Sequence, residues 1–206
     1  MVDYGKAIKR PFTDIKKLII GFVLNIIPIV NFLVIGYQLE CAKTAMKKNF
    51  KLPEWENWGD LFIRGLLGFI IVVIYFIPFL IVLAILGISL LPFIAFGGRQ
   101  PGISEFSNFI GGGIILTIVF VIAMYLLPVA LLSYVERLNF GDAFSFGKVF
   151  KKAFTSQYFI SWFLLVIYGF IISVILSVIP FVGGALSGYI IGVTAMTVFG
   201  ELYHSL

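Results

Sequence analysis

Long stretches of this chain contain no charged residue, and these stretches define its architecture. Residues 65–98, 106–135 and 153–200 have no Asp, Glu, Lys or Arg. Each stretch exceeds the ~20 apolar residues that a helix needs to cross the hydrocarbon core of a bilayer. A fourth charge-free stretch, residues 18–39, is just long enough. The pattern predicts an all-α polytopic membrane helical bundle.

The fourth stretch differs from the others because Pro28 lies near its middle. Proline inside a helix removes a hydrogen bond and clashes with the preceding turn. We expect two short helices that meet at residues 27–31, the first beginning near Phe12, with Lys16 and Lys17 reaching toward the headgroups. The pair crosses twice or forms a re-entrant hairpin. The alternative is one kinked span, which gives five helices and an outside N-terminus.

The other stretches predict four clearer spans, at residues 65–91, 110–135, 158–179 and 181–200. With the first pair they give about six transmembrane helices in a single membrane domain, residues 1–206. The helices form three hairpins joined by cytoplasmic interfacial helices. The hairpins cover residues 12–47, 65–135 and 158–203.

Positive charges orient these spans. Of the 15 Lys and Arg residues, five lie in residues 1–17, five in 40–64 and four in 136–157, which leaves Arg99 alone. Because Lys and Arg in short loops mark the cytoplasmic side, both termini are expected inside and the Arg99 segment outside. The net charge of +5 then indicates attraction to anionic lipid headgroups rather than to nucleic acid. The chain is expected to be a multi-pass protein of the cell membrane.

The composition offers little for catalysis or metal binding. The mean hydropathy is +1.09, and the chain has one cysteine, Cys41, and one histidine, His204. A single residue of each kind excludes an intrachain disulfide and argues against a metal or iron–sulfur site. No predicted span carries an ionisable acid or base other than tyrosine. We expect no catalytic residue, no metal and no cofactor.

Two parts of the sequence resemble each other. The pattern IP-x-V followed by Gly-Tyr at residues 27–37 recurs at residues 179–189, and an Asn-Phe pair opens the linkers at Asn49 and Asn139. These segments of the first and third hairpins match at an offset of 152 residues. An internal parallel repeat explains the match, and chance similarity between apolar segments is the alternative.

The linkers combine aromatic and charged residues. Residues 52–62 hold two tryptophans among acids, and residues 143–154 alternate Phe with Lys. Tryptophan prefers the headgroup level, so both segments are predicted to be amphipathic and interfacial. They act as membrane anchors or as a lipid- or partner-binding surface. The candidate residues of that surface are Trp55, Trp58, Phe62, Arg64, Phe146, Lys148, Lys151 and Lys152.

The first of these regions resembles a known family. Residues 27–66 contain an IP-V-NF…GY segment followed by an LP-x-W…W…LF-x-x-G-L segment, and this pattern is similar to the prokaryotic membrane family called domain of unknown function 4013. The chain has Gln38, Glu40 and Lys43 where the family pattern has arginines. The family carries no assigned activity, so the resemblance implies architecture only. The matching positions are Pro28, Asn31, Phe32, Gly36, Tyr37, Pro53, Trp55, Trp58, Phe62, Gly65 and Leu66.

Two further groups of residues concern the helices themselves. A polar turn or cavity is predicted at the Pro28 break, because an amide in hydrocarbon must find a partner. Its residues are Asn25, Pro28, Asn31 and Gln38. Glycines four residues apart lie on one helical face and allow close packing. The predicted packing glycines are Gly184, Gly188 and Gly192. Bonding between helices is the structural alternative to a cavity.

These observations predict a non-enzymatic integral membrane protein with a lipid- or partner-binding, scaffolding role. Its expected partners are membrane lipids, another membrane protein or a second copy of itself. The alternative is a small transporter or channel for an uncharged or amphipathic solute.

Overall fold

The structure is a computed structural model that describes residues 2–95, 103–180 and 182–206. Helices and short 3-10 turns make up its regular structure, and no strand occurs within these ranges. The all-α prediction is confirmed. The helices in chain order are α1 (Tyr4–Lys9), η1 (Arg10–Phe12), α2 (Ile15–Ile26), α3 (Asn31–Met46), α4 (Trp58–Ala95), α5 (Ile103–Arg137), η2 (Phe140–Phe144), α6 (Phe146–Ala153), α7 (Ser156–Leu176), α8 (Val182–Leu202) and η3 (Tyr203–Ser205).

Within the described residues, four helices are long and apolar enough to cross a membrane. They include Trp58–Ser89 of α4, Ile110–Arg137 of α5, Ser156–Leu176 of α7, and Val182–Ser205, which covers α8 and η3. These segments correspond to the four clearer spans that the charge-free stretches predict. The segment around Arg99 that was expected outside lies beyond the described residues.

The first pair of helices is broken at the predicted place. Helix α2 ends at Ile26 and α3 begins at Asn31, with a turn around Pro28 between them. At 1.5 Å per residue, α2 is about 18 Å long and α3 about 24 Å. Both are shorter than the ~30 Å hydrocarbon core. Helix α2 begins three residues later than expected for a start near Phe12, because Asp14 caps it by accepting the Lys17 N–H.

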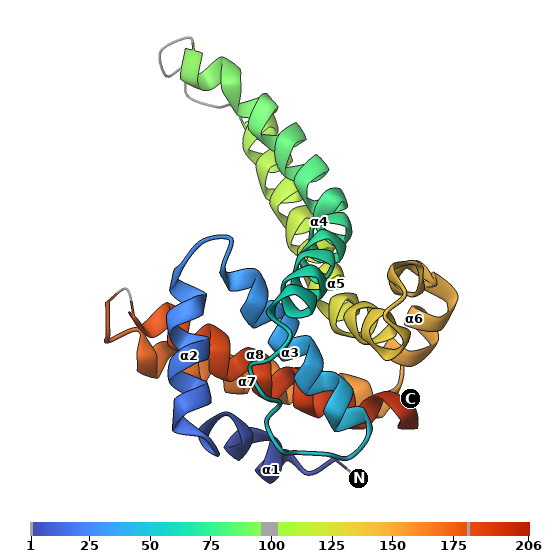
Figure 1. Ribbon diagram of the computed structural model, residues 1–206. Helices are drawn as coiled ribbons and strands as arrows, with labels where there is room; N and C mark the ends of the chain where they lie inside the picture. The colour runs from blue at the N-terminus through green and yellow to red at the C-terminus, as the bar shows by residue number, and fades with distance from the viewer. Residues whose placement is uncertain (1, 96–102, 181) are drawn as a thin grey trace. The chain divides into compact units, whose positions relative to one another are not determined.

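The described chain forms two compact units, residues 1–71 with 128–206, and residues 72–127. In the first unit α3 packs along α8, and α2 and α7 also lie against α8 (Figure 1). The second unit holds parts of α4 and α5 that meet through aromatic rings. Phe120 lies 5.7 Å from Phe76 and 5.4 Å from Phe79, measured between ring centroids.

Helices α3 and α4 approach closely at two glycines of the first unit. A Cβ on Gly36 would collide with the Leu61 carbonyl, and a Cβ on Gly65 would collide with the Phe32 carbonyl. Both glycines belong to the family-like pattern. The pattern therefore marks a backbone crossing between α3 and α4, for which small residues are required.

The first linker is not the interfacial helix that was predicted. Residues 47–57 run without helical structure between α3 and α4. Lys48 and Asn57 adopt left-handed backbone conformations, with φ of 58° and 51°, and Pro53 lacks a backbone N–H. Carbonyls of this linker accept hydrogen bonds from side chains of the N-terminal segment instead of from the backbone N–H groups of a helix.

The structure brings residues of the proposed repeat into similar positions. Tyr37 of α3 and Tyr189 of α8 share one buried cluster, with their ring centroids 6.2 Å apart. The two linkers also begin alike: the Asn49 side chain accepts the Lys51 N–H at 3.0 Å, and the Asn139 side chain accepts the Gly141 N–H at 3.1 Å. The internal repeat itself stays a prediction.

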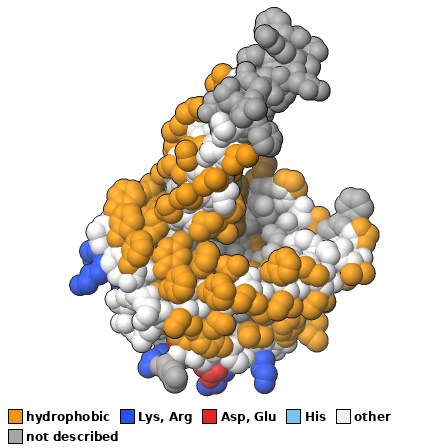
Figure 2. Space-filling view, turned by 180° about the vertical axis from the view of Figure 1, so that it is seen from behind, with side chains coloured by type: hydrophobic (Ala, Val, Ile, Leu, Met, Phe, Trp, Pro, Cys, Tyr) orange, Lys and Arg blue, Asp and Glu red, His pale blue; other side chains and the backbone are white. Residues whose placement is uncertain are grey.

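The long helices expose large apolar side chains. Examples are Ile85 and Ile88 on α4, Ile114 on α5, and Phe170 and Ile175 on α7, all at least 55% exposed. Hydrophobic side chains cover much of the face in Figure 2, and Lys and Arg side chains gather at its edge. Such extended apolar surface marks a membrane or protein interface, and the hydropathy of the helices assigns it to lipid.

Candidate functional site

Arg10 is the most deeply buried cation among the described residues, with 1% of its surface exposed. Its guanidinium donates to the Cys41 carbonyl at 2.9 Å, to the Thr197 hydroxyl at 2.9 Å and to the Thr44 hydroxyl at 2.7 Å. It also donates to the Lys51 carbonyl at 2.9 Å. One side chain thus joins η1, α3, α8 and the first linker.

The Arg10 site is neutral apart from the guanidinium. The ion pairs in the described chain do not include Arg10, and its bonds go to hydroxyl and carbonyl oxygens. Burial lowers the pKa of Arg10 from its usual value, but guanidinium stays protonated in proteins. The site therefore stabilises a buried charge through hydrogen bonds alone.

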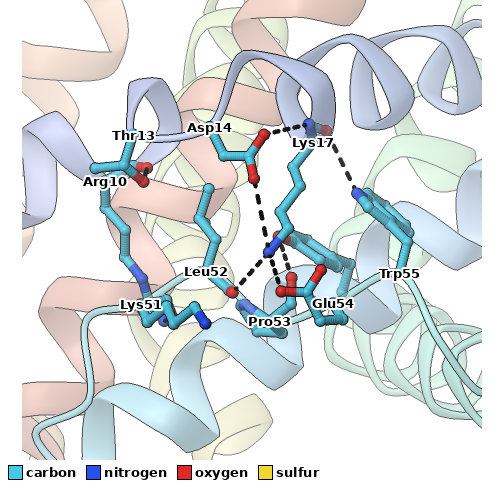
Figure 3. A network of polar contacts seen from close by, with 10 residues as sticks. Arg10, Thr13, Asp14, Lys17, Lys51, Leu52, Pro53, Glu54 and Trp55 are labelled. Carbon is cyan, nitrogen blue, oxygen red and sulfur yellow. Dashed lines mark hydrogen bonds and ion pairs between the residues drawn. The ribbon is translucent and has the colours of Figure 1, made fainter.

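Lys17 fixes the next part of the linker (Figure 3). Its ammonium donates to the Leu52 carbonyl at 3.1 Å, and it lies 2.7 Å from the Glu54 carboxylate and 3.8 Å from the Asp14 carboxylate. Only 8% of Lys17 is exposed. The expectation that Lys17 reaches toward the headgroups was wrong, because its ammonium is held by the linker.

An aromatic stack continues from this network. The rings of Tyr37 and Trp55 lie parallel, with centroids 4.0 Å apart and an interplanar angle of 9°. The Tyr37 hydroxyl donates to the Pro53 carbonyl at 3.0 Å, and the Trp55 indole donates to the Lys17 carbonyl at 3.4 Å. The linker is therefore fixed by packing as well as by charge.

Sequence reasoning missed the buried roles of Arg10 and Lys17. Both belong to a basic group of five in residues 1–17 that suits a cytoplasmic tail. Apart from Asp14, three residues before Lys17, the partners of the two side chains lie 31 or more residues away in the sequence, so no local spacing identifies them. The sequence signal that did point to this region was the mixture of aromatic and charged residues in the linker, which includes Trp55.

The residues predicted for a polar turn do not gather around one cavity. The Asn25 amide donates to the Ala185 carbonyl at 2.8 Å, and the Gln38 amide donates to the Gly188 carbonyl at 3.2 Å. Asn31 begins α3, and Pro28 is exposed in the turn. Two of the four side chains thus join α2 and α3 to the backbone of α8.

The three predicted packing glycines lie in different surroundings. A Cβ on Gly188 would lie 3.0 Å from the Asn25 amide nitrogen, and one on Gly192 would collide with the Gln38 side chain. A Cβ on Gly184 would meet nothing within 4 Å. Gly188 and Gly192 therefore face α2 and α3.

The structure divides the predicted lipid or partner surface. Trp55 is half-buried in the stack, and Phe62 packs edge-on against Phe32 with centroids 5.8 Å apart. Arg64 forms an ion pair with Glu40 of α3.

The remaining members of that surface are more exposed, apart from Lys152. Lys152 donates to the Tyr203 carbonyl at 2.6 Å and lies over the Tyr203 ring. Burial lowers the pKa of Lys152, opposed by the nearby Glu136 carboxylate. Trp58, Phe146, Lys148 and Lys151 are exposed.

Three phenylalanines lie along one side of α6, two within the helix and the third, Phe154, directly after its end. Phe146, Phe150 and Phe154 are 54%, 43% and 72% exposed, and a spacing of four residues places them on one helical face. Val149 and Ala153 are buried and attach the helix to the first unit.

The helix ends of the first unit enclose a hollow of about 540 Å³. In it the Tyr4 and Ser161 hydroxyls lie 2.8 Å apart, and the Glu201 carboxylate accepts the Asp3 N–H at 3.0 Å. The lining carries a cation, Lys48, and an acid, Glu201, and it is also partly apolar. The lining residues are Val2, Tyr4, Met46, Lys48, Gln157, Ile160, Ser161, Glu201, Leu202, His204 and Ser205.

A second hollow of about 320 Å³ is rich in acids. Two of its acids already have cationic partners, since Glu40 pairs with Arg64 and Glu54 with Lys17. In the part of the chain that the structure describes, no group of three or more His, Cys, Asp or Glu residues is placed to hold a metal ion. The residues that line this second hollow are Glu40, Pro53, Glu54, Glu56, Asn57, Asp60, Leu61 and Arg64.

Comparison with known proteins identifies a family but no characterised relative. Residues 19–181 match the family described as "Protein of unknown function (DUF4013)". No match was found among curated proteins or among solved structures. The match extends well beyond the segment that carried the resemblance and covers most of the chain. The chain belongs to the DUF4013 family, whose function is unknown.

Proposed function

We propose that this protein is a non-catalytic integral membrane protein that binds lipid at its cytoplasmic surface. Helices α4, α5, α7 and α8 cross the membrane, and both termini lie in the cytoplasm. The exposed aromatic face of α6, bordered by lysines, is the observation that carries the lipid-binding role.

The helices α2 and α3 form a re-entrant hairpin in this proposal. Each is too short to cross the hydrocarbon core, and the turn around Pro28 breaks the segment between them. The bonds of Asn25 and Gln38 to α8 carbonyls support this arrangement, because they hold both helices against α8. A re-entrant pair also keeps the positively charged N-terminus on the cytoplasmic side.

Helix α6 lies in the interface in this proposal. Phe146 and Phe150 are exposed and border the side of the helix that buries Val149 and Ala153, and helical spacing places Lys148 and Lys151 on other sides of the helix. An apolar face bordered by cations binds anionic membrane surfaces. The apolar face enters the headgroup region, and the lysines attract lipid phosphates.

Spin labels on α6 test this arrangement. Cys41 is the only cysteine, so Cys41→Ala provides a background for single cysteines. In liposomes, a label at Phe150→Cys should be relaxed by oxygen and protected from a water-soluble nickel chelate. The matched label at Lys151→Cys should show the opposite accessibility. Equal exposure of both labels to nickel would contradict the interfacial position of α6.

The transport alternative rests on the helix break at Pro28, a feature that occurs at the binding sites of some transporters. The amides of Asn25 and Gln38 are already bonded to α8 carbonyls, which leaves fewer groups to line a pathway. Solute flux into liposomes that is lost on Asn31→Leu would favour the transport alternative over lipid binding.

A further inference from the structure

We propose that the 540 Å³ hollow at the helix ends binds a phospholipid whose headgroup carries both a phosphate and a primary ammonium, as in phosphoethanolamine lipids. The inference rests on the proposed membrane function and goes beyond it by naming a site and a lipid class. The site is separate from the aromatic face of α6.

The hollow lies at the level where headgroups are expected. Gln157 and Ser161 belong to the first two turns of α7, and Glu201 and Leu202 to the last turn of α8. Lys48 follows the end of α3, where its left-handed backbone, φ 58°, turns the chain away. If α7 and α8 cross the membrane, their shared end is at the cytoplasmic interface. The volume is within the ~300–1,000 Å³ typical of small-molecule sites.

The lining offers one partner for each charge of such a headgroup. The Glu201 carboxylate accepts the Asp3 N–H at 3.0 Å, and a carboxylate has about four acceptor positions in all. It can therefore also accept an ammonium N–H. The Lys48 ammonium, on the same lining, supplies donors for a phosphate.

A buried hydroxyl pair forms part of the wall of the site. Ser161 is 1% exposed; its hydroxyl donates to the Gln157 carbonyl at 2.8 Å and lies 2.8 Å from the Tyr4 hydroxyl. These bonds hold α1 against α7 and keep Tyr4 on the lining. The wall is thereby fixed before a ligand enters.

An apolar path leads from the hollow along α7. Ile160 lines the hollow, and Leu164, Ile167 and Ile171 follow it on the same helical face, all between 43% and 55% exposed. An acyl chain can lie along this row while the headgroup occupies the hollow. The path favours a lipid over a free phosphoethanolamine.

The charge pattern discriminates among lipid classes. A phosphatidylglycerol headgroup has no cation for Glu201, and a choline headgroup has no N–H to donate to its carboxylate. A hydrogen bond to a charged group contributes about 1.5–3 kcal/mol. We therefore expect at least about a tenfold preference for phosphatidylethanolamine over both other lipids.

Native mass spectrometry of the full chain in detergent tests this inference. The purified protein is mixed with equal amounts of phosphatidylethanolamine, phosphatidylglycerol and phosphatidylcholine of identical acyl chains. The wild type should retain phosphatidylethanolamine preferentially. Glu201→Gln, which keeps an acceptor for the Asp3 N–H, should remove this preference, and Lys48→Gln should lower retention of all three. The control Lys47→Gln changes the exposed neighbouring lysine and should have no effect.

Three results would overturn the inference. The first is equal retention of the three lipids by the wild type. The second is unchanged retention by both pocket variants with unchanged thermal stability. The third is displacement of the lipid by soluble phosphoethanolamine at the same concentration, which would assign the hollow to a free metabolite. None of these results alters the spin-label test on α6, so failure of this site is distinguishable from failure of the proposed function.

Discussion

At the scale of single residues, a buried arginine joins segments that are distant in sequence. Arg10 connects η1 to α3, α8 and the first linker through hydroxyl and carbonyl oxygens. A planar guanidinium can serve this many acceptors at once, whereas an ammonium has three donors on one atom. The side chain is therefore specific to this position in a way that the surrounding surface lysines are not.

We predict that Arg10→Met destabilises the protein by more than the ~1.5–3 kcal/mol of a single hydrogen bond to a charged group, because several buried acceptors lose their donor together. Arg10→Lys should restore only part of the stability. The measurement is the midpoint of thermal unfolding in detergent, with the exposed Lys9→Met as the control. Equal midpoints for Arg10→Met and Lys9→Met would show that the Arg10 contacts do not stabilise the fold.

At the scale of elements, the helices were easier to predict than the linkers. The charge-free stretches located α4, α5, α7 and α8, and Pro28 located the break between α2 and α3. These features depend on local composition and on a steric rule, which a sequence displays directly. The family resemblance at residues 27–66 was also confirmed by the longer match at residues 19–181.

The first linker could not be predicted in the same way. Its composition resembles an interfacial helix, yet its carbonyls at Lys51 and Leu52 are bound by Arg10 and Lys17. Those contacts depend on folding and leave no periodic signal. The sequence therefore identified Trp55 as notable but not its stacking on Tyr37. It grouped Trp55 with Trp58, which stacks on Trp55 with ring centroids 5.8 Å apart but is the more exposed of the two.

This difference predicts unequal effects of two similar substitutions. Trp55→Ala removes the ring stacked on Tyr37 and the indole bond to Lys17. An aromatic pair contributes about 0.5–1.5 kcal/mol beyond the area it buries, so the unfolding midpoint should fall. Trp58→Ala removes a ring that stacks on Trp55 but is 45% exposed, so it should change the midpoint less. A larger fall for Trp58→Ala would contradict the placement of Trp55 in the core.

At the scale of the whole molecule, apolar helix surfaces and the grouping of positive charges support one arrangement in a membrane. In the part of the chain that the structure describes, four helices have the length and composition of spans, and α2 and α3 are shorter than the hydrocarbon core. The proposed hairpin around Pro28 therefore adds no crossing, and the N-terminus stays on the same side as α6 and the C-terminus. The six-span arrangement gives the same side to both termini but places the Pro28 turn outside.

Cysteine accessibility in intact cells tests this central claim most directly. Cys41 is buried, so single cysteines are introduced in a Cys41→Ala background and treated with a membrane-impermeant maleimide. Lys9→Cys and Lys151→Cys should react only after permeabilisation, Arg99→Cys should react in intact cells, and Ile29→Cys, at the turn of the re-entrant pair, should not react from outside. Labelling of Ile29→Cys in intact cells would contradict the re-entrant hairpin, and labelling of Lys9→Cys would contradict the cytoplasmic N-terminus.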